Sequence, residues 1–295
     1  MEITAELISI ALCTYNGEAY LAEQLLSLTR QTYKNIEIVI VDDSSSDHTV
    51  SIIRNFQAAD SRIKLYCNEQ NLGFNANFKK AISLCTAKYV AIADQDDIWM
   101  EDKLSIMMAK IGDNLLCYHN SAYINDQGTV SGKSTLSAHR FTEGFCSNLL
   151  VLNNCVSGHA CLIRKELLDQ ASPFPQDLYY DWWLSYTAAC QGRITFTTET
   201  LVHYRLHNNS ITRADKKHSK ALRIQNFRYF RDHSLTPPNV SLFLSSLLYQ
   251  YKKSESRFFS LPLFTMLLKN YAVLFYTRKR SLFSNLRFIF RESIN

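Results

Sequence analysis

The stretch "YVAIADQDDIW" (Tyr89–Trp99) passes directly from an apolar run into a cluster of acids. The first five residues, Tyr89–Ala93, have the composition of a short buried strand. Three of the next four residues are Asp94, Asp96 and Asp97. Because carboxylates held this close repel one another, they remain ionised together only if a cation compensates them. The stretch therefore predicts a strand that ends at a cation-binding site.

The segments before and after this strand alternate between strand and helix patterns. Short apolar runs recur at "LISIAL" (7–12), "IEIVIV" (36–41) and "IKLY" (63–66). Between and after the runs, apolar residues follow a helical spacing: Leu21, Leu25 and Leu28; Phe78, Ala81, Ile82 and Cys85; Leu104, Met107, Met108 and Ile111. Alternation with near-continuous apolar strands indicates an α/β fold with a mostly parallel central sheet flanked by helices.

Polar clusters follow three of the expected strands: "CTYNG" (13–17), "DDSSSD" (42–47) and "DQDD" (94–97). Ligands of parallel sheets bind beyond the carboxyl ends of the strands, where these clusters lie. Asp47 is explained as a helix cap, which leaves Asp42 or Asp43 as a ligand candidate. No G-x-G-x-x-G or Walker motif is present, so the nucleotide folds that those motifs mark are disfavoured.

The acidic cluster has the chemistry of a hard-cation site. Residues two apart at a strand end project to the same side, so we expect Asp94 and Asp96 to converge and Gln95 to point away. Carboxylate oxygens without cysteine or clustered histidine favour Mg²⁺ or Mn²⁺. A helix cap at Asp97 or Asp102 would account for only part of the cluster.

Composition describes a globular chain in a reducing compartment. Of the 295 residues, 46% are apolar and 20% charged, which excludes a disordered chain. The eight cysteines form no C-x-x-C pair and no zinc spacing, so we expect free, mostly buried thiols. The N-terminal residues lack the pattern of a signal peptide. The expected location is the cytoplasm.

Charge divides the chain into two parts. Residues 216–295 contain 15 Lys or Arg and three acids, a net charge of +12, whereas residues 1–215 have a net charge of −7. We therefore expect a catalytic domain over 1–215 and a basic, aromatic-rich helical region over 216–295. Pro262 and Lys269 interrupt its longest apolar run, which disfavours a transmembrane span.

The basic region has two compatible interpretations. Its helices could lie on an anionic membrane, as a peripheral contact, or could pack on the catalytic domain with Lys and Arg in solvent. A nucleic-acid partner is not expected, because no binding motif is present and the first part of the chain is acidic.

Seven segments, in this order, resemble a known family: "ALCTYNG", "IVIVDDSSSDHT", "NEQNLGFNANF", "ADQDDIW", "VSGHACLIRKEL", "YYDWWLSY" and "HYRLHNNSIT". Over roughly residues 5 to 215 the chain resembles the inverting family-two glycosyltransferases with the GT-A fold, and within them bacterial rhamnosyltransferases. The resemblance implies transfer of a sugar from a nucleoside-diphosphate donor, dTDP-rhamnose or a UDP-sugar, to a lipid-linked saccharide acceptor. It implies synthesis of cell-surface polysaccharide at the inner face of the cell membrane.

The resemblance also implies a role for individual residues. The nucleotide-binding positions would be Cys13, Thr14, Tyr15, Asp43, Asn71, Gly73, Asn77 and Asp94. Asp43 would accept a hydrogen bond from a pyrimidine ring N–H, which suits a carboxylate. Asp94, Asp96 and His207 would hold the Mg²⁺ or Mn²⁺ ion, and Arg205 would contact the diphosphate.

Asp181 in "YYDWWL" matches the catalytic base of the family. Trp182 and Trp183 give it an apolar surrounding, which raises the pKa of a carboxyl group and makes its carboxylate a stronger base. The alternative is an ordinary helix N-cap. If Asp181 were only a cap, Asp177 would be the next candidate for the base.

Two other functions stay in view. A sugar nucleotidyltransferase would need a Gly-rich, Arg- or Lys-bearing phosphate loop after the first strand, and "CTYNG" offers neither. A non-catalytic nucleotide-sugar or membrane-binding module would not need Asp94, Asp96 and Asp181 together.

Overall fold

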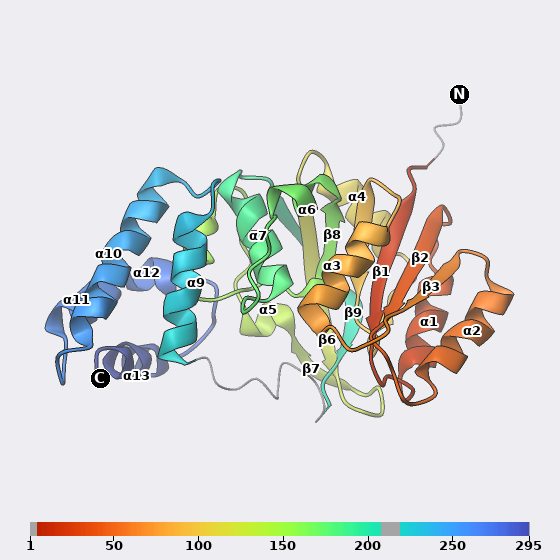
Figure 1. Cartoon of the computed structure of the whole chain (residues 1–295), viewed down its shortest axis with the longest axis horizontal. Helices are drawn as coiled ribbons and strands as arrows, with labels where there is room; N and C mark the ends of the chain where they lie inside the picture. The colour runs from red at the N-terminus through yellow and green to blue at the C-terminus, as the bar shows by residue number, and fades with distance from the viewer. Residues whose placement is uncertain (1–4, 208–218, 295) are drawn as a thin grey trace.

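A computed structural model of the chain describes residues 5–207 and 219–294. It contains a nine-stranded sheet with helices on both faces and a group of C-terminal helices beside α7 (Tyr180–Cys190) (Figure 1). The strand order is β3-β2-β1-β4-β8-β6-β9-β5, and β7 pairs with β6 outside this path.

The first half of the sheet is parallel, as predicted. Its strands are β1 (Ile8–Thr14), β2 (Ile36–Asp42), β3 (Ile63–Cys67) and β4 (Tyr89–Ala93), which pair in parallel. The helices of this half are α1 (Leu21–Thr29), α2 (Thr49–Ala59) and α3 (Phe74–Leu84). Every residue of β1, β2 and β4 is buried, because helices cover both faces, and this explains their unbroken apolar sequence.

The second half of the sheet is mixed. Its elements are β5 (Ile98–Trp99), α4 (Lys103–Ile111), β6 (Leu116–Ile124), β7 (Val130–Ser134), α5 (Thr135–Ala138), β8 (Cys161–Arg164), α6 (Glu166–Gln170), α7 and β9 (Ile194–Arg205). β8 is antiparallel to β4 and β6, and β5 is antiparallel to β9, whereas β6 and β9 are parallel. The α/β class is confirmed, with antiparallel pairings confined to this half.

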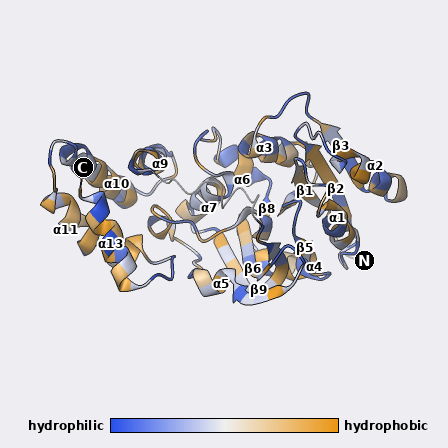
Figure 2. Cartoon of the chain, turned by 90° about the horizontal axis from the view of Figure 1, so that it is seen from below, coloured by the Kyte–Doolittle hydropathy of each residue, from blue (hydrophilic) through white to orange (hydrophobic). Residues whose placement is uncertain are grey.

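The C-terminal region is helical and packs on α7. It consists of α9 (Lys220–Asp232), α10 (Pro238–Ser254), α11 (Leu261–Lys269), α12 (Tyr271–Leu274) and α13 (Leu282–Glu292). The ring of Trp183 lies 6.1 Å from that of Phe230 and 4.6 Å from that of His233. Hydrophobic and hydrophilic residues alternate along α11 and α13 (Figure 2).

Two further sequence expectations concern this part of the chain. The predicted boundary at 215/216 lies outside the described residues, so the division into two domains stays a prediction. Among the helices of residues 5–207 and 219–294, none is long and apolar enough to cross a bilayer. All eight cysteines are free and seven are buried, as expected.

Candidate active site

The acidic cluster forms a turn between β4 and β5. Because the strand ends at Ala93, strand alternation no longer sets the directions of the side chains. Ligand atoms of Asp94, Asp97 and His159 lie within 4.8 Å of one another. Asp96 instead pairs with His207, whose Nε2 is 2.7 Å from Asp96 Oδ2. The expected shared face for Asp94 and Asp96 is thus replaced by two adjacent groups.

The group of Asp94, Asp97 and His159 fits a hard divalent cation. Asp97 is fully buried, and within the described part of the chain its Oδ2 atom has no hydrogen-bond partner. Burial raises the pKa of Asp97 well above its usual range, and the charges of Asp96 and Asp94 raise it further. An unpartnered carboxylate oxygen among other acids is suited to a cation, and a set rich in oxygen favours Mg²⁺ or Mn²⁺.

Sequence reasoning did not select Asp97 and His159 as metal ligands. Nδ1 of His159 lies 3.6 Å from Asp94 Oδ2, and its Nε2 is 2.9 Å from the Ser121 hydroxyl. Lys103 supports this segment from below, since its Nζ donates to the His159 carbonyl at 2.7 Å. The signal that could have found His159 is its place in "VSGHACLIRKEL" (156–167).

Gln95 connects the acidic turn to the loop after β1. The Tyr15 N–H donates to Gln95 Oε1 at 2.9 Å, and Gln95 Nε2 donates to the Tyr15 carbonyl at 3.1 Å. A Cβ atom at Gly17 would lie 2.3 Å from Gln95 Oε1, so a glycine is needed there. Tyr15 is 48% exposed, the only half-open side chain of the three nucleotide candidates in this loop, whereas Cys13 and Thr14 are buried.

Asp43 organises the loop that precedes α3. Its carboxylate accepts hydrogen bonds from the N–H groups of Leu72 (2.8 Å) and Gly73 (2.9 Å) and from Asn68 Nδ2 (2.7 Å). Gly73 has φ +80°, a left-handed conformation that favours glycine. Asn71 Nδ2 donates to the Asp43 carbonyl at 3.3 Å. Recognition of the nucleotide base by this loop stays a prediction.

Asn77 and Asp42 are buried supports of the same region. Asn77 Nδ2 donates to the Val41 carbonyl at 2.9 Å. Asp42 accepts from the Thr14 hydroxyl at 2.8 Å and from the backbone and hydroxyl of Ser45. Between the two acids that end β2, Asp42 therefore fixes the loops, and Asp43 stays the ligand candidate.

Asp181 is the second residue of α7, and Tyr179 is the N-cap, so the cap alternative does not hold. Its Oδ2 accepts from the Gly158 N–H at 3.1 Å, and its Oδ1 accepts from the Trp182 N–H at 2.6 Å. Burial raises the pKa of Asp181 to about 7, and the charge of Asp94 adds to this. The expected direction of the shift is confirmed, and the influence of Asp94 places the two acids in one site.

Asp181 opens into a cleft of about 1190 Å³ between the sheet and the C-terminal helices. Asn154, Tyr179 and Trp182 line it near Asp181, and side chains of α9, α13 and the segment around Arg278 line it opposite. Ligand pockets commonly measure roughly 300–1,000 Å³, so a saccharide and its aglycone both fit.

Comparison with known proteins identifies the family. Glycosyl transferase family 2 matches residues 9–171, more than half of the chain. The chain belongs to this family. A glucosyltransferase of Escherichia coli, UDP-Glc:alpha-D-GlcNAc-diphosphoundecaprenol beta-1,3-glucosyltransferase WfgD, is 33% identical over 185 residues, 61% of this chain and 69% of that protein. An uncharacterised glycosyltransferase of Haemophilus influenzae is 27% identical over 76% of this chain and 74% of its own length.

Solved structures share the GT-A fold of this glycosyltransferase. TarS 1–349 of S. aureus in complex with UDP-GlcNAc has a TM-score of 0.64 at 18% identity, covering 98% of this chain and 82% of that one. The mannosyltransferase PcManGT of Pyrobaculum calidifontis, in complex with GDP-Man and Mn²⁺, has a TM-score of 0.59 at 17% identity, covering 98% and 85%. The expected fold is confirmed.

In this glycosyltransferase Arg205 ties three loops together. Its guanidinium, 1% exposed, donates to the carbonyls of Asp96 (2.8 Å) and Asp126 (3.0 Å) and pairs with Glu23 at 2.5 Å. The expected contact with the diphosphate stays a prediction. The positions described here make Arg205 a support of the acidic turn.

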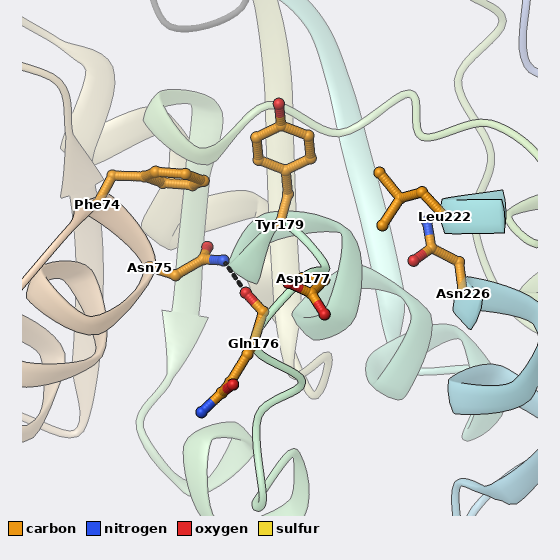
Figure 3. Close-up of a pocket in the computed structure, with 7 residues that line it drawn as sticks. All are labelled: Phe74, Asn75, Gln176, Asp177, Tyr179, Leu222 and Asn226. Carbon is orange, nitrogen blue, oxygen red and sulfur yellow. Dashed lines mark hydrogen bonds between the residues drawn. The ribbon is translucent and has the colours of Figure 1, made fainter. Parts of the chain in front are cut away.

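Asn75 positions the loop that leads to Asp181, a role that the sequence did not reveal. Its Nδ2 donates to the carbonyls of Gln176 (3.2 Å) and Leu178 (3.0 Å), and its Oδ1 accepts from the Tyr180 N–H at 3.0 Å. Figure 3 draws Asn75 at the edge of a separate pocket of about 210 Å³. Asp177, the second candidate for the base, lines this pocket and not the larger cleft.

Proposed function

We propose that this glycosyltransferase transfers a sugar, with inversion, from a nucleoside-diphosphate donor to a lipid-linked saccharide acceptor in bacterial cell-surface polysaccharide synthesis. The similarity to WfgD, whose name specifies a UDP-sugar donor and a diphosphoundecaprenol-linked acceptor, supports the substrate classes. A UDP-sugar is thus the first donor to test, followed by dTDP-rhamnose. The place of action would be the cytoplasmic face of the membrane.

The observation that carries this proposal is the carboxylate of Asp181, which has a pKa of about 7 and opens into the cleft. A general base works best when its pKa lies near the operating pH. Asp181 would accept the proton of the acceptor hydroxyl as that oxygen attacks the anomeric carbon. A single in-line displacement of this kind inverts the configuration.

The acidic cluster would hold the donor diphosphate through a divalent cation. We place Asp94 in its first coordination shell, with Asp97 and His159 or with Asp96 and His207 completing the protein ligands. When bound, Mg²⁺ or Mn²⁺ supplies charge stabilisation for the departing diphosphate. Cys13, Thr14, Tyr15, Asp43, Asn71, Gly73 and Asn77 would form or support the nucleotide pocket, and Arg205 would hold the acidic turn against it.

Family membership argues against a sugar nucleotidyltransferase, and the raised pKa of Asp181 against a merely binding module. Peripheral contact of the C-terminal helices with an anionic membrane would bring the enzyme to a lipid-linked acceptor.

The substitution Asp181→Asn tests the proposal. It keeps the size of the side chain but cannot accept a proton, so kcat should fall by roughly two to four orders of magnitude while donor Kd changes little. Transfer assays with a panel of nucleotide-sugars, beside calorimetry of donor binding, measure both quantities. Asp177→Asn, in the separate pocket, is the matched control and should retain activity. Wild-type turnover in Asp181→Asn would contradict the assignment.

A further inference from the structure

The wall of the cleft opposite Asp181 is strongly basic. Five cationic side chains line it, all from the C-terminal region: Lys220, Arg223, Arg278, Arg280 and Arg291. The only acids of the lining are Asp181 and Glu292. The cleft therefore combines one catalytic carboxylate with a separate surface of positive charge.

Two of these cations are already committed to protein groups. Arg223 pairs with Glu292 at 2.6 Å, and Tyr251 donates to the same carboxylate at 2.9 Å. Lys220 Nζ donates to the Ile294 carbonyl at 3.2 Å. Glu292 is thus consumed within the wall and does not neutralise the remaining arginines.

Arg278 and Arg280 have no such partner. Within residues 5–207 and 219–294, neither guanidinium makes an ion pair or a hydrogen bond to an acceptor. Burial and the neighbouring charge of Arg280 lower the pKa of Arg278, as expected for a cation without a counter-ion. Proteins rarely hold two uncompensated guanidinium groups together unless an anion binds there.

His139 lies beside this pair and also lacks a partner. Its Nδ1 is buried without a hydrogen-bond partner among the described residues, and its backbone bridges to that of Arg278. Burial, together with the charges of Arg278 and Arg280, lowers the pKa of His139 to about 4. A neutral histidine and two arginines form a site that donates hydrogen bonds to an anion.

We propose that Arg278 and Arg280 bind a phosphate or diphosphate group of the acceptor, while the acceptor's saccharide reaches Asp181. This inference rests on the proposed function and specifies its acceptor as phosphorylated. Arginine matches phosphate oxygens with paired N–H groups, which suits a diphosphate or a phosphodiester. The C-terminal helices are then a substrate-binding wall of the active site.

Calorimetry with inorganic pyrophosphate tests the site without the transfer reaction. The titration uses the full chain in a chelating buffer, where the acidic cluster lacks a cation and repels the anion. Arg278→Gln/Arg280→Gln should weaken binding roughly ten- to a hundredfold, because each variant removes a charge-assisted hydrogen bond. Arg287→Gln, an exposed arginine of α13 outside the cleft lining, is the matched control and should bind like wild type. Arg280→Gln alone, at an exposed position, provides a milder variant if the double variant unfolds.

Equal pyrophosphate affinity in the wild type and both cleft variants would overturn the proposal. Competition then identifies the source of the phosphate: a short-chain prenyl diphosphate sugar and a polyol-phosphate oligomer are compared as displacers, and displacement by either supports an acceptor site. Displacement only by vesicles of acidic phospholipid would assign the arginines to membrane headgroups and overturn the acceptor role. Failure of every nucleotide-sugar in the transfer assay would count against the proposed function but leave this titration decisive for the anion site.

Discussion

At Asp181 the property that suits catalysis also costs stability. A carboxyl group whose pKa in the folded state is about 7 lies above its unfolded value, so the folded state binds the proton more tightly. The stability that this proton confers is full at acid pH and is lost as pH rises from about 4 through 7. Chemical denaturation should therefore find Asp181→Asn more stable than the wild type at pH 8, with little difference near pH 4.

This measurement also guards the activity assay, since a loss of turnover with a gain of stability cannot be attributed to unfolding. If Asp181→Asn is destabilised at pH 8, the hydrogen bonds from Gly158 and Trp182 dominate the site instead.

Asp94 tests the metal at the same scale. Asp94→Asn removes one of several repelling carboxylates, so the metal-free protein should be no less stable than the wild type. Mn²⁺ at a hundred times its Kd should stabilise the wild type by about 2.7 kcal/mol, and the variant should lose most of this gain. Thermal unfolding with and without Mn²⁺ measures it. Asp102→Asn is the control, because Asp102 is exposed and makes no side-chain cap. Equal Mn²⁺ shifts in Asp94→Asn and the wild type would exclude Asp94 as a ligand.

At the scale of elements, α3 and α7 are coupled through Asn75. Its three hydrogen bonds hold the loop 176–180, which sets where α7 begins and hence where Asp181 points. Asn75→Ala should lower kcat by roughly tenfold or more, because small misplacements of a catalytic group are costly, with little effect on donor KM.

A partial replacement separates the two kinds of bond made by Asn75. Asn75→Asp keeps an acceptor for the Tyr180 N–H and loses both donors, so its kcat should fall between those of the wild type and Asn75→Ala. Steady-state kinetics of the three proteins decides the matter, and an unchanged kcat in Asn75→Ala would show that the loop holds its position without these bonds.

The sequence predicted those elements whose pattern is local. β1 to β4 and the intervening helices follow from apolar periodicity, because covering both faces of a strand leaves a direct trace in composition. The antiparallel β8 and the pairing of β5 with β9 depend on contacts between distant segments, which periodicity does not record. The same limit applies to the site: Asp94 and Asp181 stand out in their motifs, whereas Asn75 and His159 gain their roles only from tertiary neighbours.

At the scale of the whole molecule, the C-terminal helices present two different surfaces. One is the basic wall of the cleft, and the other carries exposed apolar side chains. On α13, Phe283 is 76% exposed and Phe290 is 52% exposed, and their spacing of seven places them on one helical face with Arg287 between them. A helical face that combines exposed aromatic rings with basic residues is suited to an anionic bilayer surface.

Membrane docking can therefore be tested without removing the helices, whose contacts with Trp183 make truncation unsuitable. The full chain should co-sediment with acidic phospholipid vesicles at low salt and dissociate as salt screens the charges. Phe283→Ser/Phe290→Ser should reduce this binding, because it removes the apolar surface that would enter the headgroup region. Phe145→Ser is the matched control, since Phe145 is 81% exposed but lies in the catalytic part of the chain. Binding that survives in the double variant, yet still falls with salt, would assign membrane contact to the basic residues alone; sedimentation that no variant and no salt concentration alters would reject α13 as a docking surface.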